Sequence, residues 1–307
     1  PTSFIVSKET GSENGFGSSE NPFLKIQDAI DQTINNDIVL VSPGTYQENI
    51  LIDEKVITVT TPSPLESAQT TIIDGGANGI PVVRIQGKYG EYYVSISGLL
   101  FSGFTLQNGL TATTNQGAGI TIFEFSSVVN LKNLIIKNNT SSNYAAGSYF
   151  YYTGNVFVSD VVYENNSGEH IFRGFNSPFE MTRTAFYENT ATSQVVKYSQ
   201  NQTNHRPLIT NSIIRNNSSS GALNVMKLNI FNTTIVNNGS QNLFSDNCAI
   251  INSIISSGQF ISLSTSGGIL EIQNSLIEDG ESSINILPAF LTYENNLEGD
   301  IYFTDIT

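Results

Sequence analysis

Basic side chains are concentrated in one window of an otherwise acidic chain. Residues 170–227 hold six Lys and Arg against two acids, so the window carries +4 in a chain whose net charge is −14. A local positive surface on an acidic protein favours anionic ligands such as acidic sugars. The cationic and imidazole side chains of the window are Arg173, Arg183, Lys197, Arg206, Arg215, Lys227, His170 and His205.

Four of these residues have the types that a polysaccharide lyase needs. Such an enzyme removes a proton beside a uronate carboxylate, which requires a base and a cation that neutralises the carboxylate. The lyase hypothesis assigns the base to Lys197 or His205 and the carboxylate clamp to Arg173 and Arg206. The competing interpretation is that these are solvated side chains, spaced to relieve repulsion in an acidic protein.

The spacing also predicts a ligand-binding column. Arg173 and Lys197 each lie eight residues after a recurring Asn and directly after an apolar pair, so we expect them to stack on adjacent repeats. The pair Val225-Met226 before Lys227 suggests that Lys227 extends the column. Tyr faces stack well on sugar rings, although half of a strand's side chains must point inward as core. The predicted ligand-binding residues are His170, Lys227, Tyr149, Tyr151 and Tyr198.

A short sequence motif recurs through the last two-thirds of the chain and is clearest in NSIIRNN at residues 211–217. The repeated unit that contains it must position the residues named above. Equivalent residues on adjacent strands lie about 4.8 Å apart, so a repeated amide predicts a hydrogen-bonded ladder. The alternative is that Asn serves only as a good turn former. The repeated Asn stands at Asn108, Asn138, Asn165, Asn189, Asn216 and Asn237, and a second polar column five residues earlier includes Asn133, Asp160, Thr184, Asn211 and Asn232.

The period and the composition together indicate a solenoid of short strands. Repeats of about 20 to 30 residues are too short for paired helices, which need about 33 or more. Ile, Val, Thr, Tyr and Phe alternate with Asn, Gly and Ser, as is typical of strands and turns. We therefore predict an all-β parallel β-helix as a single domain over residues 1–307, with about ten coils from residue 38 onward.

One amphipathic helix is predicted before the first coil, over residues 22–34. Asn21 would be its N-cap and Pro22 its first residue. In a solenoid of strands such a helix is expected to cover the open N-terminal end of the coil. The apolar residues of its predicted buried face are Phe23, Ile26, Ile30 and Ile34.

Two motifs carry a family resemblance that covers nearly the whole chain. The run GFGSSENPFLKIQDAIDQTINNDIVLVSPGTYQENILI at residues 15–52 resembles the opening of right-handed parallel β-helix proteins of the pectin-lyase-like superfamily. The repeated motif resembles the Phe-x-x-Asn repeat of chlamydial polymorphic outer membrane proteins and of many secreted bacterial β-helix proteins. Its best copy is Phe186-Tyr187-Glu188-Asn189. The resemblance implies a right-handed parallel β-helix with an N-terminal capping helix.

The resemblance does not imply an activity, because the same scaffold hosts lyases, hydrolases, esterases and adhesins. The Arg-x-Pro-x-x-Arg motif of pectate lyases and the Asp-Asp and Gly-His-Gly motifs of polygalacturonases are missing, and the chain has no Trp for the esterase motif. A Ca²⁺ site is not supported by any dense cluster of acids. We predict no cofactor and no metal.

Charge and composition exclude other classes. The net charge of −14 argues against nucleic acid and anionic membrane as partners, and no apolar run approaches the roughly 18 residues of a membrane span. Cys248 is the single cysteine, so no disulfide framework exists.

An exposed charge column is also expected, formed by Lys137, Glu164, Glu188 and Arg215. Asn-x-Ser/Thr triplets, interpreted as a by-product of composition, begin at residues that include Asn139, Asn165, Asn201, Asn217, Asn232 and Asn238.

These observations favour a secreted or cell-surface β-helix module of bacterial origin that adheres to or binds a polysaccharide or cell-surface glycan without catalysis. The first alternative is a polysaccharide lyase that acts on a uronate polymer. The second is a structural stalk or secretion passenger. A groove around the basic window would favour the enzyme, and an exposed aromatic strip would favour the binder. The sequence does not indicate the oligomeric state.

Overall fold

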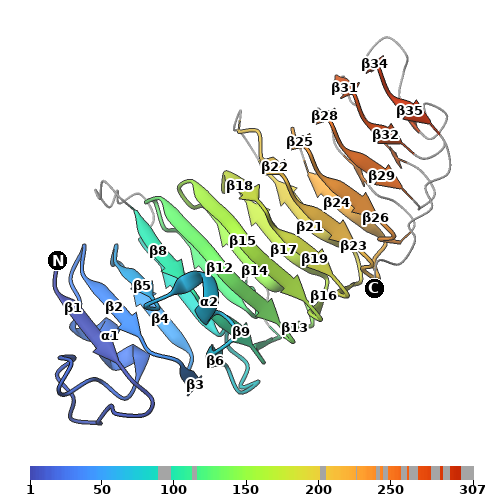
Figure 1. Cartoon of the computed structure of the whole chain (residues 1–307). Coiled ribbons are helices and arrows are strands. Elements are labelled where there is room, and N and C mark those ends of the chain that lie inside the picture. The colour runs from blue at the N-terminus through green and yellow to red at the C-terminus, as the bar shows by residue number, and fades with distance from the viewer. Residues whose placement is uncertain are drawn as a thin grey trace.

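The computed structural model shows strands stacked in parallel along one long axis (Figure 1). Among the described residues the largest sheet, called sheet A, holds 21 strands, and it is accompanied by an eight-stranded sheet B and a four-stranded sheet C. The structure describes residues 1–88, 98–112, 116–200, 205–225, 227–239, 243–244, 248–256, 261–262, 269–277, 284–285 and 291–298.

Sheet A consists of two parallel series of strands joined at a bend. The first series is β1 (Ser3–Val6), β2 (Ile38–Val41), β5 (Thr58–Thr60), β8 (Leu99–Ser102), β12 (Val129–Lys137), β15 (Val156–Glu164), β18 (Phe179–Thr182), β22 (Leu208–Thr210), β25 (Asn229–Phe231), β28 (Cys248–Ile251), β31 (Leu270–Gln273) and β34 (Leu291–Glu294). The second series is β3 (Gly44–Gln47), β6 (Thr71–Asp74), β9 (Thr105–Gln107), β19 (Ala185–Tyr187), β23 (Ile213–Arg215), β26 (Thr234–Val236), β29 (Ile254–Ser256), β32 (Leu276–Ile277) and β35 (Leu297–Glu298). The long strands β12 and β15 pass through both series.

Sheet B lies on the other side of the coil, and in four coils a strand of sheet C lies between sheets A and B. Sheet B consists of β4 (Ile50–Asp53), β7 (Val83–Gln86), β11 (Ile120–Phe123), β14 (Ala145–Tyr151), β17 (His170–Phe175), β21 (Gln194–Ser199), β24 (Gly221–Val225) and β27 (Leu243–Phe244). Sheet C consists of β10 (Leu110–Thr111), β13 (Thr140–Ser141), β16 (Ser167–Gly168) and β20 (Thr190–Ala191), and β30 (Ile261–Ser262) pairs with β33 (Ile284–Asn285). A coil with a sheet C strand, such as β9-β10-β11, therefore runs from sheet A through sheet C to sheet B.

The core lies inside the coil and is filled by stacked apolar side chains. Alternate residues of each strand point inward, so equivalent positions on successive coils place like side chains against one another. Tyr163 and Phe186, for example, stack with ring centroids 4.4 Å apart and planes 1° from parallel. Phe172 packs edge-on against Phe150 and Phe179. This continuous burial is the main stabilising contribution of a solenoid.

Buried amides form the predicted ladder, but mostly one residue later than expected. The ladder residues are Asn139, Asn166, Asn189, Asn217 and Asn238, each at most 3% exposed. Each of the first four donates from Nδ2 to Oδ1 of the next, over 3.0, 3.0, 2.8 and 2.7 Å. Only Asn189 coincides with a predicted position. The repeated Asn138, Asn165, Asn216 and Asn237 are exposed turn residues with φ between 52° and 54°. Between the last two, Asn237 Nδ2 donates to Asn216 Oδ1 at 3.4 Å.

The second predicted column marks a bend, and within it Asn232 Nδ2 donates to Asn211 Oδ1 at 3.2 Å. Asn133, Asp160, Asn211 and Asn232 have φ between 50° and 57°, where sheet A turns between its two series. The residue after each of them points inward. From Thr184 onward that inward column is hydroxyl-bearing, and the Ser212 and Ser253 hydroxyls accept from the backbone N–H groups of Thr184 and Thr233.

Helix α1 (Ile26–Gln32) is shorter than the predicted helix over residues 22–34. Its first N–H groups, on Ile26 and Gln27, donate to the two carboxylate oxygens of Glu48 at 3.0 Å each, so a distant side chain caps the helix instead of Asn21. Ile26 and Ile30 are buried as predicted, whereas Ile34 lies beyond the helix and is 73% exposed.

Helix α1 lies beside β1, β2 and β4 at the N-terminal end of the coil (Figure 1). The edge of β1 that faces away from β2 pairs with the segment that follows β1. Ile5 N–H donates to Gly17 O at 2.8 Å, and Phe23 N–H donates to Ile5 O at 2.9 Å. The role of α1 as an end cap stays a prediction. A second short helix, α2 (Pro64–Ser67), lies between β5 and β6.

Candidate functional site

The register of sheet B places Arg173 and Lys197 directly side by side. Arg173 of β17 pairs with Lys197 of β21, and Tyr149 of β14 pairs with Arg173 on the opposite side. The next member of this column is Asn224, not Lys227. The prediction for Lys227 is wrong because that residue lies past the end of β24, in a turn with φ 55°.

The two cations of this pair have no carboxylate salt bridge in the described part of the chain. The Arg173 guanidinium carbon lies 4.0 Å from the centre of the Tyr144 ring, and the buried Nε has no hydrogen-bond partner there. Burial lowers the pKa of Lys197, the Arg173 charge lowers it further, and Glu169 raises it in part. Two half-buried cations at adjacent positions repel each other, so an anion placed between them would be stabilised.

His170 lies beside this pair and is kept neutral. Its side chain is 3% exposed, and burial together with the Arg173 charge lowers its pKa to about 4. Its Nδ1 faces Gln194 O at 3.2 Å, and its Nε2 is 3.6 Å from an oxygen of the half-exposed Glu169. At neutral pH His170 therefore adds a polar wall to the site and not a third charge.

A strip of aromatic rings runs next to the cation pair on the same outer face of sheet B. Phe123, Tyr151 and Phe175 occupy one column, two residues along the strands from the Arg173 column. Their planes are within 15° of parallel, with centroids 4.9 and 5.6 Å apart, and all three side chains are partly exposed. The strip therefore has the ring faces and edges that a sugar could contact.

Two of the predicted ligand-binding tyrosines are not exposed. Tyr198 points into the core, where it meets Phe179 edge-on with centroids 5.5 Å apart, so its assignment as a stacking residue is wrong. Tyr149 lies on the outer face but is covered by Tyr144, and the centroids of the two rings are 4.9 Å apart. Burial raises the pKa of the Tyr149 hydroxyl, with a further contribution from Tyr144.

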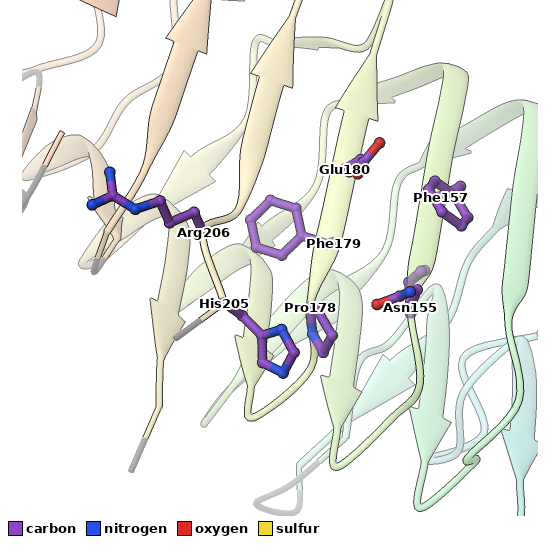
Figure 2. A pocket seen from close by; sticks show the side chains of 8 residues that line it. Asn155, Phe157, Pro178, Phe179, Glu180, His205 and Arg206 are labelled. Atoms are coloured by element: carbon purple, nitrogen blue, oxygen red, sulfur yellow. The ribbon is translucent and has the colours of Figure 1, made fainter. Parts of the chain in front are cut away.

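His205 and Arg206 lie in a different place. They line a small open pocket of about 130 Å³ at the beginning of β15, β18 and β22 in sheet A, together with Phe157 and Glu180 (Figure 2). Neither Arg173 nor Lys197 lines this pocket. The four residues of the lyase hypothesis are thus divided between two locations, and residues 201–204, part of the segment between them, lie outside the described residues.

The predicted charge column on sheet A is present with one change. Lys137, Glu164 and Arg215 are in register, but Tyr187 takes the place expected for Glu188. The Tyr187 hydroxyl donates to Glu164 at 2.5 Å, and Lys137 is 3.8 Å from the same carboxylate. Glu188 is the left-handed turn residue of this coil, with φ 55°. Glu164 and Glu188 therefore do not form a carboxylate pair on one strand column.

The described residues contain no group of three or more His, Cys, Asp or Glu that could hold a metal ion. None of the helices in the described ranges is long and apolar enough to cross a membrane. Sequence reasoning missed Tyr144, Glu169 and Phe123 as parts of the site. Phe123 could have been found by extending the Tyr151 column back one coil, whereas Tyr144 lies in an irregular turn that periodicity does not reach.

Comparisons with known proteins agree on the fold. No family profile matches the chain. The pectate lyase Pel9A is similar over 96% of this chain and 79% of its own, with a TM-score of 0.61 and 14% identity. A rhamnogalacturonan lyase is similar over 98% of this chain and 90% of its own, with a TM-score of 0.51 and 12% identity. The chain therefore has a parallel β-helix fold, as the sequence predicted.

One curated protein is similar in sequence. A cell surface glycoprotein of Methanothermus fervidus is 30% identical over 103 residues, which are 31% of this chain. The match spans only 17% of that protein's length.

Proposed function

We propose that this protein is an extracellular or cell-surface module that binds a glycan on the outer face of sheet B. The observation that carries the proposal is the aromatic strip of Phe123, Tyr151 and Phe175 beside the cation pair of Arg173 and Lys197. The strip supplies apolar ring faces along the coil axis, and the pair supplies positive charge one row away. Together they suit a sugar chain that carries acidic groups.

Charge balance favours an acidic over a neutral glycan. The Arg173 and Lys197 charges are in adjacent register positions, and Glu169, the described acid whose charge acts on Lys197, is half-exposed and close to His170. A bound carboxylate or sulfate would offset the repulsion within the pair. A neutral sugar would not.

The comparisons support the proposal without testing it. The sequence relative is named as a cell surface glycoprotein, which favours a surface location for this chain. Two proteins of similar fold are named as lyases of pectate and rhamnogalacturonan, which favours a polysaccharide as partner.

The test is a binding titration of the full chain with pectate, alginate and a neutral glucan. We expect binding to the acidic polymers to weaken at least about tenfold in the Arg173→Gln/Lys197→Gln variant, because each charge-assisted hydrogen bond contributes about 1.5 kcal/mol or more. Tyr151→Ala should weaken all binding, since it removes the middle ring of the strip. Lys132→Gln on the exposed face of sheet A is the matched charge control and should bind as the parent does. Equal binding by the parent and the double variant would overturn the proposal.

One observation favours a second candidate, a polysaccharide lyase. The pKa of Lys197 is lowered, and Arg173 beside it could hold a uronate carboxylate. Lysine would then take the proton next to the carboxylate while the glycosidic oxygen leaves, and the product would be an unsaturated uronate. Its ultraviolet absorbance should rise with pectate or alginate and be lost in Lys197→Gln. A flat trace with tight binding would leave the non-catalytic module, and a flat trace without binding would leave the structural stalk.

A further inference from the structure

The left-handed turn after the second series of sheet A carries a repeated motif that the proposed binding site does not use. Three turns read Asn-Asn-Thr or Asn-Asn-Ser, at residues 138–140, 165–167 and 216–218. Each is an Asn-x-Ser/Thr triplet, the acceptor motif for N-linked sugars. In every case the first Asn and the hydroxyl residue are exposed, while the second Asn is the buried ladder residue.

The structure separates triplets that could be modified in the folded protein from those that could not. Overlapping triplets also begin at the ladder residues Asn139 and Asn217, whose Nδ2 atoms donate inside the coil. Asn138, Asn165 and Asn216 have φ of 53°, 52° and 53°, which turns their side chains outward. No hydrogen bond to a described residue is made by the Nδ2 atom of any of these three.

The register also aligns the three outward residues. Lys137, Glu164, Tyr187 and Arg215 pair in succession, so the residues that follow them form one column of turns. Asn138 and Asn165 occupy adjacent coils, about 4.8 Å apart. Glu188 occupies the next coil and separates Asn165 from Asn216 by about 10 Å. A bulky sugar on Asn138 therefore competes for space with one on Asn165, whereas Asn216 stands apart.

We propose that this column, Asn138, Asn165 and Asn216, is an N-glycosylation surface. The donor would be an oligosaccharide linked to a lipid through phosphate. The Nδ2 atom would form a bond to the anomeric carbon, the bond from that carbon to the phosphate oxygen would break, the lipid phosphate would leave, and Nδ2 would lose one proton to a base. The proposal is independent of the ligand site on sheet B.

The test is secretion of the full chain from a eukaryotic host that attaches N-glycans. Enzymatic release of the glycans in heavy-oxygen water converts each occupied Asn to a mass-marked Asp, which peptide mapping locates. We expect marks at Asn138, Asn165 and Asn216 and none at Asn139 or Asn217. Asn138→Gln should raise the occupancy of Asn165 and leave that of Asn216 unchanged.

Overlapping triplets provide a matched pair of controls. Thr140→Ala removes the triplet of Asn138 but keeps that of Asn139, whereas Ser141→Ala does the reverse. Thr140→Ala should lose the mark at residue 138 and gain none at residue 139. Ser141→Ala should keep the mark at residue 138. Folding of each secreted variant is checked by its thermal unfolding midpoint. Folded protein without marks in the outward column, or with marks on the ladder residues, would overturn the proposal.

Discussion

At the scale of single residues, the ladder shows how a polar side chain is accommodated inside an apolar coil. Asn189 donates from its backbone N–H and from Nδ2 to Asn217 Oδ1, and Nδ2 also reaches the carbonyl oxygens of Tyr163 and Tyr187. Its own Oδ1 accepts from the backbone and side chain of Asn166. Every polar atom of the side chain is thus paired, and each coil is fixed in register against the next.

Removal of one ladder amide should therefore cost more than removal of a surface amide. We expect Asn189→Ala to lower the free energy of unfolding by about 3 to 5 kcal/mol, because several buried donors and acceptors lose their partner at about 1 to 3 kcal/mol each. Urea unfolding followed by circular dichroism measures the change. The control is Asn165→Gly, which keeps the left-handed turn and should shift stability by less than about 1 kcal/mol. Similar losses in both variants would contradict the role of the ladder.

His170 gives a pH dependence with a defined sign. Its pKa is about 4 in the folded protein against 6.5 as the ordinary value, so between these two values the unfolded chain binds more protons. Stability should then fall as the pH drops from 6.5 to 4, by about 3 kcal/mol over the whole range. Arg173, Lys197 and Glu169 are the charged groups that face the ring.

The variant His170→Gln isolates this effect, because its amide can still donate to Gln194 O but does not titrate. The difference in stability between pH 7 and pH 4.5 is measured by urea unfolding for the parent and the variant. The parent should lose more stability than the variant over this interval. An equal loss in both would show that other carboxylates, and not His170, determine the dependence.

At the scale of elements, sequence periodicity predicted the strands and their neighbours better than the exact position of each side chain. Arg173 and Lys197 were placed side by side correctly because both stand eight residues after an anchoring Asn. The same count from Asn216 leads to Asn224, the residue that does follow Lys197, but the apolar pair before Lys227 suggested a later one. The repeat period specifies which residues lie side by side on successive coils. An apolar pair does not, because such pairs occur both within a strand and past its end.

The phase error at the ladder has a related physical cause. In Asn-Asn doublets such as Asn165-Asn166, either residue satisfies the period, and only the backbone decides which one is buried. The first adopts φ 52° and turns outward, which leaves the second inward. The pocket at His205 and Arg206 depends on how the segment after β21 returns to sheet A, which no repeat specifies.

The start of α1 depends on an element that is distant in sequence. Glu48 holds the N–H groups of Ile26 and Gln27, and burial raises its pKa. We expect Glu48→Ala to destabilise the N-terminal coil by about 1 to 2 kcal/mol, because the helix loses its cap. Hydrogen exchange of the amides of residues 26–32 should become faster. Glu9→Ala, at an exposed position of the preceding loop, is the control and should leave exchange in α1 unchanged.

At the scale of the whole molecule, the fold is a stack in which each coil contacts its two neighbours. The ladder, the core rings and the backbone pairs all connect consecutive coils, so stability grows approximately as a sum of neighbouring interfaces. The proposed ligand site uses the same geometry, because the strip and the cation pair each take one residue per coil. Insertion or removal of one complete coil is consequently a test of both fold and site.

Deletion of residues 166–188 removes one coil, the 23 residues that separate Asn166 from Asn189. The join of Asn165 to Asn189 keeps the turn and the ladder, and β14 would then pair with β21, so we expect a folded, shorter β-helix with circular dichroism like that of the parent. Glycan binding should be lost, because Arg173 and Phe175 are removed. Deletion of residues 166–177, about half a coil, is the control and should not fold, since it puts sheet B strands against sheet A strands. A complete-coil deletion that unfolds like the half-coil deletion would contradict the nearest-neighbour description of this molecule.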